Sequence, residues 1–297
     1  MTKKTAFFLH VIMGLLVFLF IGTRPGFSDT AATMEKEQSS EESTSYEQYK
    51  LLHTILWLQS AAENKATALQ AFNQARKMLD QALDDKTWTA ATEQTENFAD
   101  LPPAIVLDID ETILDNSPYQ ARLIMKNIEY DKVMWRQWAA ESNARPLPGA
   151  VEFVQYAHKR GVTVFYVTNR DYKLETVTRR NLEKFSFPID DSRDTVFCKY
   201  EKKWWTSDKK SRRKAIAAEF RILLLLGDNF NDFVSGTKVT PEARLVLMEK
   251  YQSYWGNQWI IIPNPLYGGW VSSLTNFDYK LSDAEKLDIF LKTLIKD

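Results

Sequence analysis

One stretch of this chain, residues 104–117, restricts the choice of fold more than any other. It begins with the apolar run Ala104 to Leu107 and then places two aspartates, Asp108 and Asp110, one residue apart. The apolar run predicts a buried strand, and the turn-forming residues after it put both aspartates at the carboxyl end, where open α/β sheets bind ligands. Two carboxylates this close repel each other unless a divalent cation neutralises them, and Mg²⁺ prefers such oxygen ligands. Taken alone, the pattern also fits a strand that ends in an acidic surface turn.

Two later apolar runs end in polar residues as well. The β-branched and aromatic run 162–167 leads into Thr168 and Asn169, whose hydroxyl and amide can donate to a phosphate oxygen. Residues 222–226 are wholly apolar, as parallel strands covered on both faces are, and they lead to Asp228. Three strands therefore present polar groups from the same end.

A basic stretch at residues 208–214 leads into a predicted helix. Most basic runs of this kind are solvated helix faces, and we expect this for all but one residue between Lys209 and Lys214. Cations in the first turn of a helix are disfavoured by the helix dipole, which favours a functional reason for the one lysine.

This ordered set resembles the four motifs of the haloacid dehalogenase (HAD) superfamily of phosphohydrolases: Asp-x-Asp, Thr or Ser, Lys, and a terminal acidic motif. Several segments are similar to the class C acid phosphatases, the bacterial surface acid phosphatases and 5′-nucleotidases: residues 108–119, 148–153, 166–170, 227–233 and 263–270, with 57–66 and 70–75 upstream. The resemblance covers roughly residues 50–272. It implies an α/β fold, a HAD-like Rossmannoid parallel sheet flanked by helices, with a small helical cap inserted after the first catalytic strand at about 115–148.

The resemblance also implies a mechanism through an aspartyl-phosphate. Asp108 would be the nucleophile, and Asp110 would protonate the leaving oxygen and then activate water. Mg²⁺ would be held by the side chains of Asp108 and Asp228 and by the backbone carbonyl of Asp110. Asp232 is expected outside the metal ligands, where it would orient Asp228 or a bound water.

Phosphate oxygens would be held by Thr168, Asn169 and one lysine. By this resemblance, the spacing to the Arg-Arg pair and to the Gly-Asp-Asn motif favours Lys209 over Lys210.

Three aromatic residues are candidates for stacking against the substrate. Tyr267 lies in a Gly-Gly turn, where glycine allows close backbone approach and leaves the ring exposed. Tyr119 and Trp135 lie in the helical insertion, and ordinary helix packing explains them equally well.

Composition excludes several other classes of protein. A net charge of −1 gives no electrostatic footprint for a nucleic acid polymer. The three histidines, at positions 10, 53 and 158, lie far from any serine or cysteine motif, so a Ser-His-Asp hydrolase lacks its parts. Cys198 is the only cysteine, and we expect it to be a partly buried small hydrophobe.

The amino terminus has the order of a secretory signal. Lys3 and Lys4 precede the apolar run 6–22, so residues 1–28 are interpreted as a signal peptide or membrane anchor. Residues 29–44 are polar and low in complexity, as in a flexible tether, and the phosphatase domain is expected over 45–297. No cysteine follows the apolar run, so the chain departs from its lipoprotein relatives. We expect export to the periplasm, cell surface or medium, with membrane attachment through the apolar run as an alternative.

The expected function is an exported, Mg²⁺-dependent acid phosphatase acting on small phosphate monoesters, 5′-nucleotides and nicotinamide mononucleotide among them. The alternative is a surface nutrient-binding protein for haem or a nucleotide, with a vestigial phosphatase site. The residues at the strand ends favour catalysis.

Overall fold

The computed structural model describes residues 51–190 and 192–296. All of these residues belong to one compact unit, Tyr46–Asp297. The predicted leader (1–28) and tether (29–44) lie outside the described residues. Within the described part, no helix combines the length and apolar character that membrane crossing requires.

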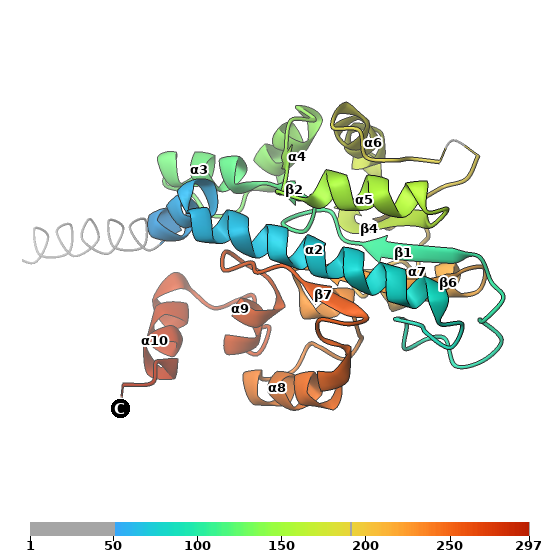
Figure 1. Cartoon of the computed structure of the whole chain (residues 1–297). Coiled ribbons are helices and arrows are strands. Elements are labelled where there is room, and N and C mark those ends of the chain that lie inside the picture. The colour runs from blue at the N-terminus through green and yellow to red at the C-terminus, as the bar shows by residue number, and fades with distance from the viewer. Residues whose placement is uncertain (1–50, 191, 297) are drawn as a thin grey trace, which may run out of the picture. The chain divides into compact units, whose positions relative to one another are not determined.

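A sheet of five parallel strands forms the centre of this unit, in the order β5-β4-β1-β6-β7 (Figure 1). The strands are β1 (Pro103–Leu107), β4 (Thr163–Asp171), β5 (Val196–Lys199), β6 (Arg221–Gly227) and β7 (Trp259–Ile261). The chain moves outward from β1 through β4 to β5, then returns to the other side of β1 for β6 and β7. Strand β1 is therefore a topological switch point, the place where such sheets bind ligands. The α/β fold with a parallel sheet is confirmed.

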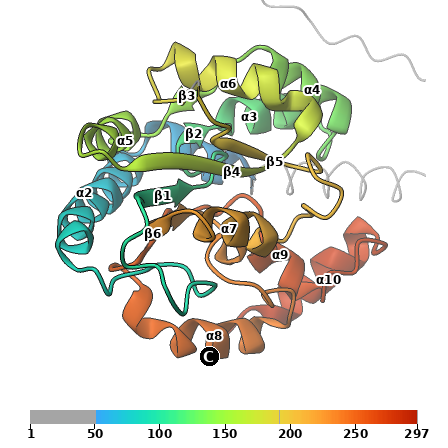
Figure 2. The ribbon, with the colours of Figure 1, turned by 90° about the vertical axis from the view of Figure 1, so that its right-hand side faces the viewer.

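Both faces of the sheet are buried, as the apolar strands predict. Ile105 and Leu107 belong to the hydrophobic core that contains α2 (Ala62–Asp84) and α5 (Ala150–Lys159). Val106 points to the opposite core, which α7 (Lys210–Ala217) covers (Figure 2). Alternate residues of β1 therefore face two helical layers, which explains why the strand contains no polar side chain.

Helices lie where the sequence predicts an insertion at about residues 115–148. The short strands β2 (Leu114–Asp115) and β3 (Arg145–Pro146) pair antiparallel at its base. Between them lie α3 (Ser117–Met125) and α4 (Lys132–Ala140). Helix α4 begins at Asp131, whose carboxylate accepts a hydrogen bond from the Met134 backbone N–H at 2.7 Å. The insertion follows β1 directly in the sequence and therefore lies beside the switch point.

The remaining helices surround the sheet. They are α6 (Glu175–Lys184), α8 (Pro241–Lys250), α9 (Gly269–Leu274), α10 (Asp283–Thr293) and the 3₁₀ turns η1 (Tyr172–Leu174), η2 (Phe230–Asp232) and η3 (Gln252–Tyr254). Helix α10 starts with a capping box between Ser282 and Glu285. The helical segment before the sheet is divided, because Ala61 takes an extended conformation between the helical residues 51–60 and α2. Cys198 is fully buried in β5, where burial raises the pKa of its thiol to about 12.

Candidate active site

A cavity of about 450 Å³ opens at the carboxyl ends of the central strands. Nine of the residues predicted from the sequence line it: Asp108, Asp110, Tyr119, Trp135, Asn169, Lys209, Asp228, Asp232 and Tyr267. Thr168 lies beside the cavity and is fully buried; its hydroxyl accepts a hydrogen bond from the Arg170 backbone N–H at 3.0 Å. The fold therefore brings the predicted set together at the switch point.

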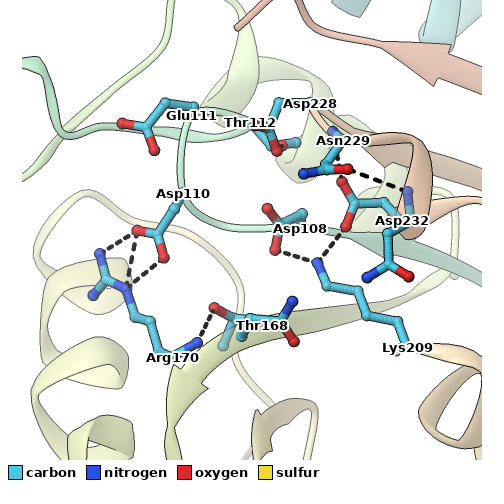
Figure 3. Close-up of polar contacts among 12 residues, drawn as sticks. Asp108, Asp110, Glu111, Thr112, Thr168, Arg170, Lys209, Asp228, Asn229 and Asp232 are labelled. Carbon is cyan, nitrogen blue, oxygen red and sulfur yellow. Dashed lines mark hydrogen bonds and ion pairs between the residues drawn. The ribbon is translucent and has the colours of Figure 1, made fainter. Parts of the chain in front are cut away.

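Asp108 and Lys209 form the centre of the site (Figure 3). The ammonium of Lys209 is buried between two carboxylates: it pairs with Asp108 and lies 2.7 Å from Asp232 Oδ1. Burial raises the pKa of Asp108 to about 6, and the adjacent Lys209 opposes this rise. Burial lowers the pKa of Lys209, but the two carboxylates outweigh it and the net shift is upward. Lys210 is exposed, so the lysine in the cavity is Lys209.

An acidic cluster surrounds this pair. One carboxylate oxygen from each of Asp108, Asp228 and Asp232 can be chosen so that all lie within 4.8 Å of one another. Burial, followed by repulsion from Asp232 and Asp108, raises the pKa of Asp228 well above its ordinary value. Asn264 holds Asp228 from the other side, with its Nδ2 donating to Asp228 Oδ2 at 2.7 Å. Closely spaced, mutually repelling carboxylates with only oxygen donors fit a hard divalent cation, which would relieve the repulsion.

Asp232 owes its position to a glycine. A Cβ at Gly227 would overlap the Asp232 side chain, so only glycine lets that carboxylate fold back against the end of β6. Asp232 Oδ2 there accepts a hydrogen bond from the Asn229 backbone N–H at 2.9 Å.

The Asp110 carboxylate turns away from the acidic cluster (Figure 3). Arg170 Nη2 and Nε donate to its two oxygens, the shortest contact being 2.7 Å from Nη2 to Oδ1. Asn116 Nδ2 also donates to Asp110 Oδ1 at 2.8 Å, and Asn116 in turn accepts from Trp138 Nε1 of α4. The carboxyl group of Asp110 is thus held apart from the cluster by a buried guanidinium and by the insertion.

The basic stretch at the start of α7 differs from the sequence expectation. Arg212 and Arg213 were expected on a solvated helix face, but both are completely buried. Arg213 pairs with Glu93, and Arg212 donates to the carbonyls of Thr168 in β4 and Thr206 in the loop before α7. The expectation was wrong because backbone carbonyl partners leave no trace in a sequence.

Asn169 lines the cavity, but both of its polar side-chain atoms already have partners. Its Oδ1 accepts from Arg212 Nη2 at 2.7 Å, and its Nδ2 donates to the Ser207 carbonyl at 3.1 Å. The Nδ2 amide carries two hydrogens, so its bond to Ser207 leaves the second one for another acceptor.

The three stacking candidates all reach the cavity wall. Tyr119 and Trp135 pack edge to face with ring centroids 5.2 Å apart, and Tyr119 is fully buried. The Trp135 ring also faces the Arg170 guanidinium at 5.5 Å. Tyr267 is 37% exposed and its hydroxyl donates to Glu111. Helix packing therefore accounts for most of Tyr119, whereas Tyr267 keeps a free ring surface at the mouth.

The turn after Tyr267 needs glycine, as predicted from the Gly-Gly pair. Gly268 has a φ of 131°, and a Cβ there would lie 2.9 Å from Asn229 Nδ2. This close approach joins the turn to the loop that follows Asp228.

Four polar residues of the site were not selected from the sequence: Arg170, Glu111, Asn116 and Asn264. Three of them, Arg170, Glu111 and Asn116, lie in or directly after the strand-end motifs. Their position in the sequence could therefore have indicated that they belong to the site. Asn264 comes from a separate Pro-Asn-Pro turn and contacts Asp228 only through the tertiary fold.

An aspartate after the central strand, a buried lysine against it and further carboxylates at the next strand end define an enzyme of phosphoryl transfer. The chain belongs to the HAD superfamily, subfamily IIIB (acid phosphatase), whose family model matches residues 28–270. It is an acid phosphatase, a hydrolase of phosphate monoesters. The expected alternative, a binding protein with a vestigial site, is not favoured.

Class B and class C acid phosphatases are among the similar proteins. The class C acid phosphatase from Bacillus anthracis, solved with tungstate bound, superposes with a TM-score of 0.74 at 32% identity, covering 84% of this chain and 98% of that one. The class B acid phosphatase of Morganella morganii is 26% identical over 56% of this chain and 72% of its own length. Acid phosphatase 1 of Solanum lycopersicum is 27% identical over 54% of this chain and 57% of its own length.

Proposed function

We propose that this protein is an exported, Mg²⁺-dependent phosphatase of the class C type, which hydrolyses 5′-nucleotides and related monoesters through an aspartyl-phosphate. The observation that carries the proposal is the convergence of Asp108, Lys209 and Asp228 in one cavity at the switch point. The class C assignment is supported by the likeness to the Bacillus anthracis enzyme and by the motif resemblance.

In the proposed first step, an Asp108 carboxylate oxygen attacks phosphorus, the bond from phosphorus to the ester oxygen breaks, and Asp110 gives its proton to the departing oxygen. In the second step Asp110 takes a proton from water, which attacks the same phosphorus, releases phosphate and restores Asp108. The separation of the two carboxylates supports this division of roles, because Arg170 and Asn116 hold Asp110 apart from the nucleophile.

Lys209 is the proposed cation for the phosphate oxygens, with the Thr168 hydroxyl as a donor. Lys209 already lies against Asp108 and so stands where negative charge gathers in the transition state. The neighbouring structure's bound tungstate, an oxyanion, is consistent with an anion site in this cavity.

Mg²⁺ is the proposed metal, held by the side chains of Asp108 and Asp228 and the backbone carbonyl of Asp110. When bound, it would neutralise phosphate and carboxylate charge as a Lewis acid. Asp232 is proposed to stand outside the ligands, which is supported by the engagement of its two oxygens with Lys209 and the Asn229 N–H.

The substrate class follows from the aromatic rings at the mouth, Tyr267 first and then Trp135 and Tyr119. A nucleobase or nicotinamide ring has a π-face whatever its identity, so stacking would hold purine, pyrimidine and nicotinamide monophosphates with little discrimination. Export is supported by the basic and apolar order of residues 1–28. A phosphatase assay of the purified protein on 5′-nucleotides, nicotinamide mononucleotide and glycerol phosphate tests the proposal. Binding of haem or a nucleotide without turnover would contradict it and favour a binding protein.

Tyr267→Ala should raise the KM for 5′-nucleotides by roughly tenfold, because loss of one stacking ring costs about 1 to 3 kcal/mol. Hydrolysis of glycerol phosphate, which has no ring, should change little. Tyr267→Phe is the matched variant: it keeps the ring and loses only the hydroxyl that donates to Glu111. Equal losses on both substrates in steady-state kinetics would make Tyr267 a packing residue.

A further inference from the structure

Two adjacent arginines at the start of α7 are buried behind the cavity. Arg213 has a carboxylate partner, Glu93, with 2.8 Å between Arg213 Nη2 and Glu93 Oε1. Arg212 makes no direct ion pair with a carboxylate in the part of the chain that the structure describes, and its burial lowers the pKa of its guanidinium to about 10. A buried cation without a carboxylate partner is costly, so its contacts identify what it does.

Those contacts join two segments of the site. One is the end of β4: Arg212 Nη1 donates to the Thr168 carbonyl, and Nη2 donates to Asn169 Oδ1 at 2.7 Å. The other is the loop before Lys209, where Nη2 donates to the Thr206 carbonyl at 2.8 Å. The planar guanidinium of Arg212 therefore holds the end of β4 and the loop before Lys209 at once. The fork geometry of arginine allows this, and a lysine cannot reproduce it.

A second set of hydrogen bonds reinforces the same loop. The Ser207 carbonyl, two residues before Lys209, accepts from Asn169 Nδ2 at 3.1 Å and from Asn231 Nδ2 at 2.7 Å. Asn169 thus connects to this loop directly and also through Arg212. The loop is held from β4 on one side and from the β6 loop on the other.

We propose that Arg212 is a positioning residue which, together with Asn169, holds residues 206–209 against the end of β4 and so sets the place of Lys209 relative to Asp108. The bond from Asn169 Nδ2 to the Ser207 carbonyl contributes to this positioning. The inference rests on the proposed role of Lys209 in holding phosphate. A lysine has a flexible stem, and a reacting group displaced by about 1 Å can lose on the order of 100-fold in rate.

Arg212→Lys keeps the charge and removes the fork. We expect kcat/KM to fall by roughly 10- to 100-fold and inhibition by inorganic phosphate to weaken. The matched control is Arg221→Lys: Arg221 is also buried but lies at the amino end of β6, where it donates to the Asp85 carbonyl. Arg221→Lys should lower the Tm while leaving the KM and phosphate inhibition unchanged. Parallel losses of phosphate affinity in the two variants would overturn the proposal.

Hydrogen exchange of the substrate-free protein separates positioning from direct phosphate contact. Backbone amides of residues 206–209 should exchange faster in Arg212→Lys, and also in Asn169→Ala, which changes an exposed residue and keeps the protein testable if Arg212→Lys does not fold. If Asn169 contacted only phosphate, exchange in this loop would equal that of the wild type and the proposal would be wrong.

Coupling between the two residues is the last measure. Arg212 and Asn169 are joined by a hydrogen bond, and both contact the loop before Lys209. The double variant Arg212→Lys with Asn169→Ala should therefore raise KM by less than the product of the two single effects. Fully multiplicative effects would mean that the residues act independently. Lys209→Ala distinguishes a failure of the proposed function from a failure of this inference. Unchanged phosphate inhibition in Lys209→Ala would refute the role of Lys209 in holding phosphate. The hydrogen-exchange result would still decide whether Arg212 holds the loop.

Discussion

Asp108→Asn should lower kcat by about three orders of magnitude or more, equivalent to roughly 4 kcal/mol of activation free energy. An amide cannot serve as the attacking oxygen, and every other predicted site residue would remain in place. The measurement is steady-state kinetics on purified protein, with circular dichroism to show that the variant is folded. Substantial activity in folded Asp108→Asn would refute the aspartyl-phosphate mechanism.

Asp110→Asn is the matched variant for this experiment, because it removes a neighbouring carboxylate with a different role. Overall turnover should again fall by about three orders of magnitude for esters of poor leaving groups. Esters of good leaving groups need little protonation, so they should still form some phosphoenzyme. Mass spectrometry after rapid quenching would detect a phosphoryl group on Asp108 in Asp110→Asn and none in Asp108→Asn.

Removal of divalent metal should abolish activity, and Mg²⁺ should restore it. The cluster of two buried carboxylates, Asp108 and Asp232, and the partly exposed Asp228 offers only oxygen donors, which select hard ions. Phosphatase assays after EDTA treatment and readdition of Mg²⁺, Ca²⁺ or Zn²⁺ test both metal need and metal choice. Activity indifferent to chelation would remove the metal from the proposal.

Asp228→Ala should weaken Mg²⁺ binding, measured by calorimetry without substrate. Asp288→Ala provides the control, because Asp288 is an exposed aspartate on α10 that pairs with Lys292. If both variants bound Mg²⁺ as the wild type does, the ligand assignment of Asp228 would be wrong.

The central sheet was predictable because its strands leave a strong pattern. Residues 104–107 and 222–226 are apolar without alternation, and burial from both sides is the physical reason for that pattern. The aspartates after these strands could be placed at one edge from parallel pairing alone. The choice of Lys209 came from family spacing, and the fold places it against Asp108.

Other parts of the site could not be predicted because their partners are distant in the chain or lie in the backbone. A basic helix start looks the same in sequence whether it faces water or, as at Arg212, the carbonyls of two segments. The contact of Asn264 with Asp228 depends on a turn beyond β7. The sequence also could not decide between helix packing and substrate stacking for the aromatic residues of the insertion. In the structure Tyr119 both packs against Trp135 and lines the cavity.

The central place of β1 has a consequence for how an active molecule comes into being. Asp108 leaves the ribosome early, but Lys209 follows 101 residues later and the strand that delivers Asp228 comes after that. β1 lies between β4 and β6 in the sheet, and β6 comes late in the sequence. The pairing of β1 with β6 can therefore form only after this late segment has been synthesised. A nascent chain with only β1, the insertion and β4 contains the nucleophile without its countercharge. Hydrolytic competence therefore arises in one late event and serves as a marker for the arrival of the carboxy-terminal half.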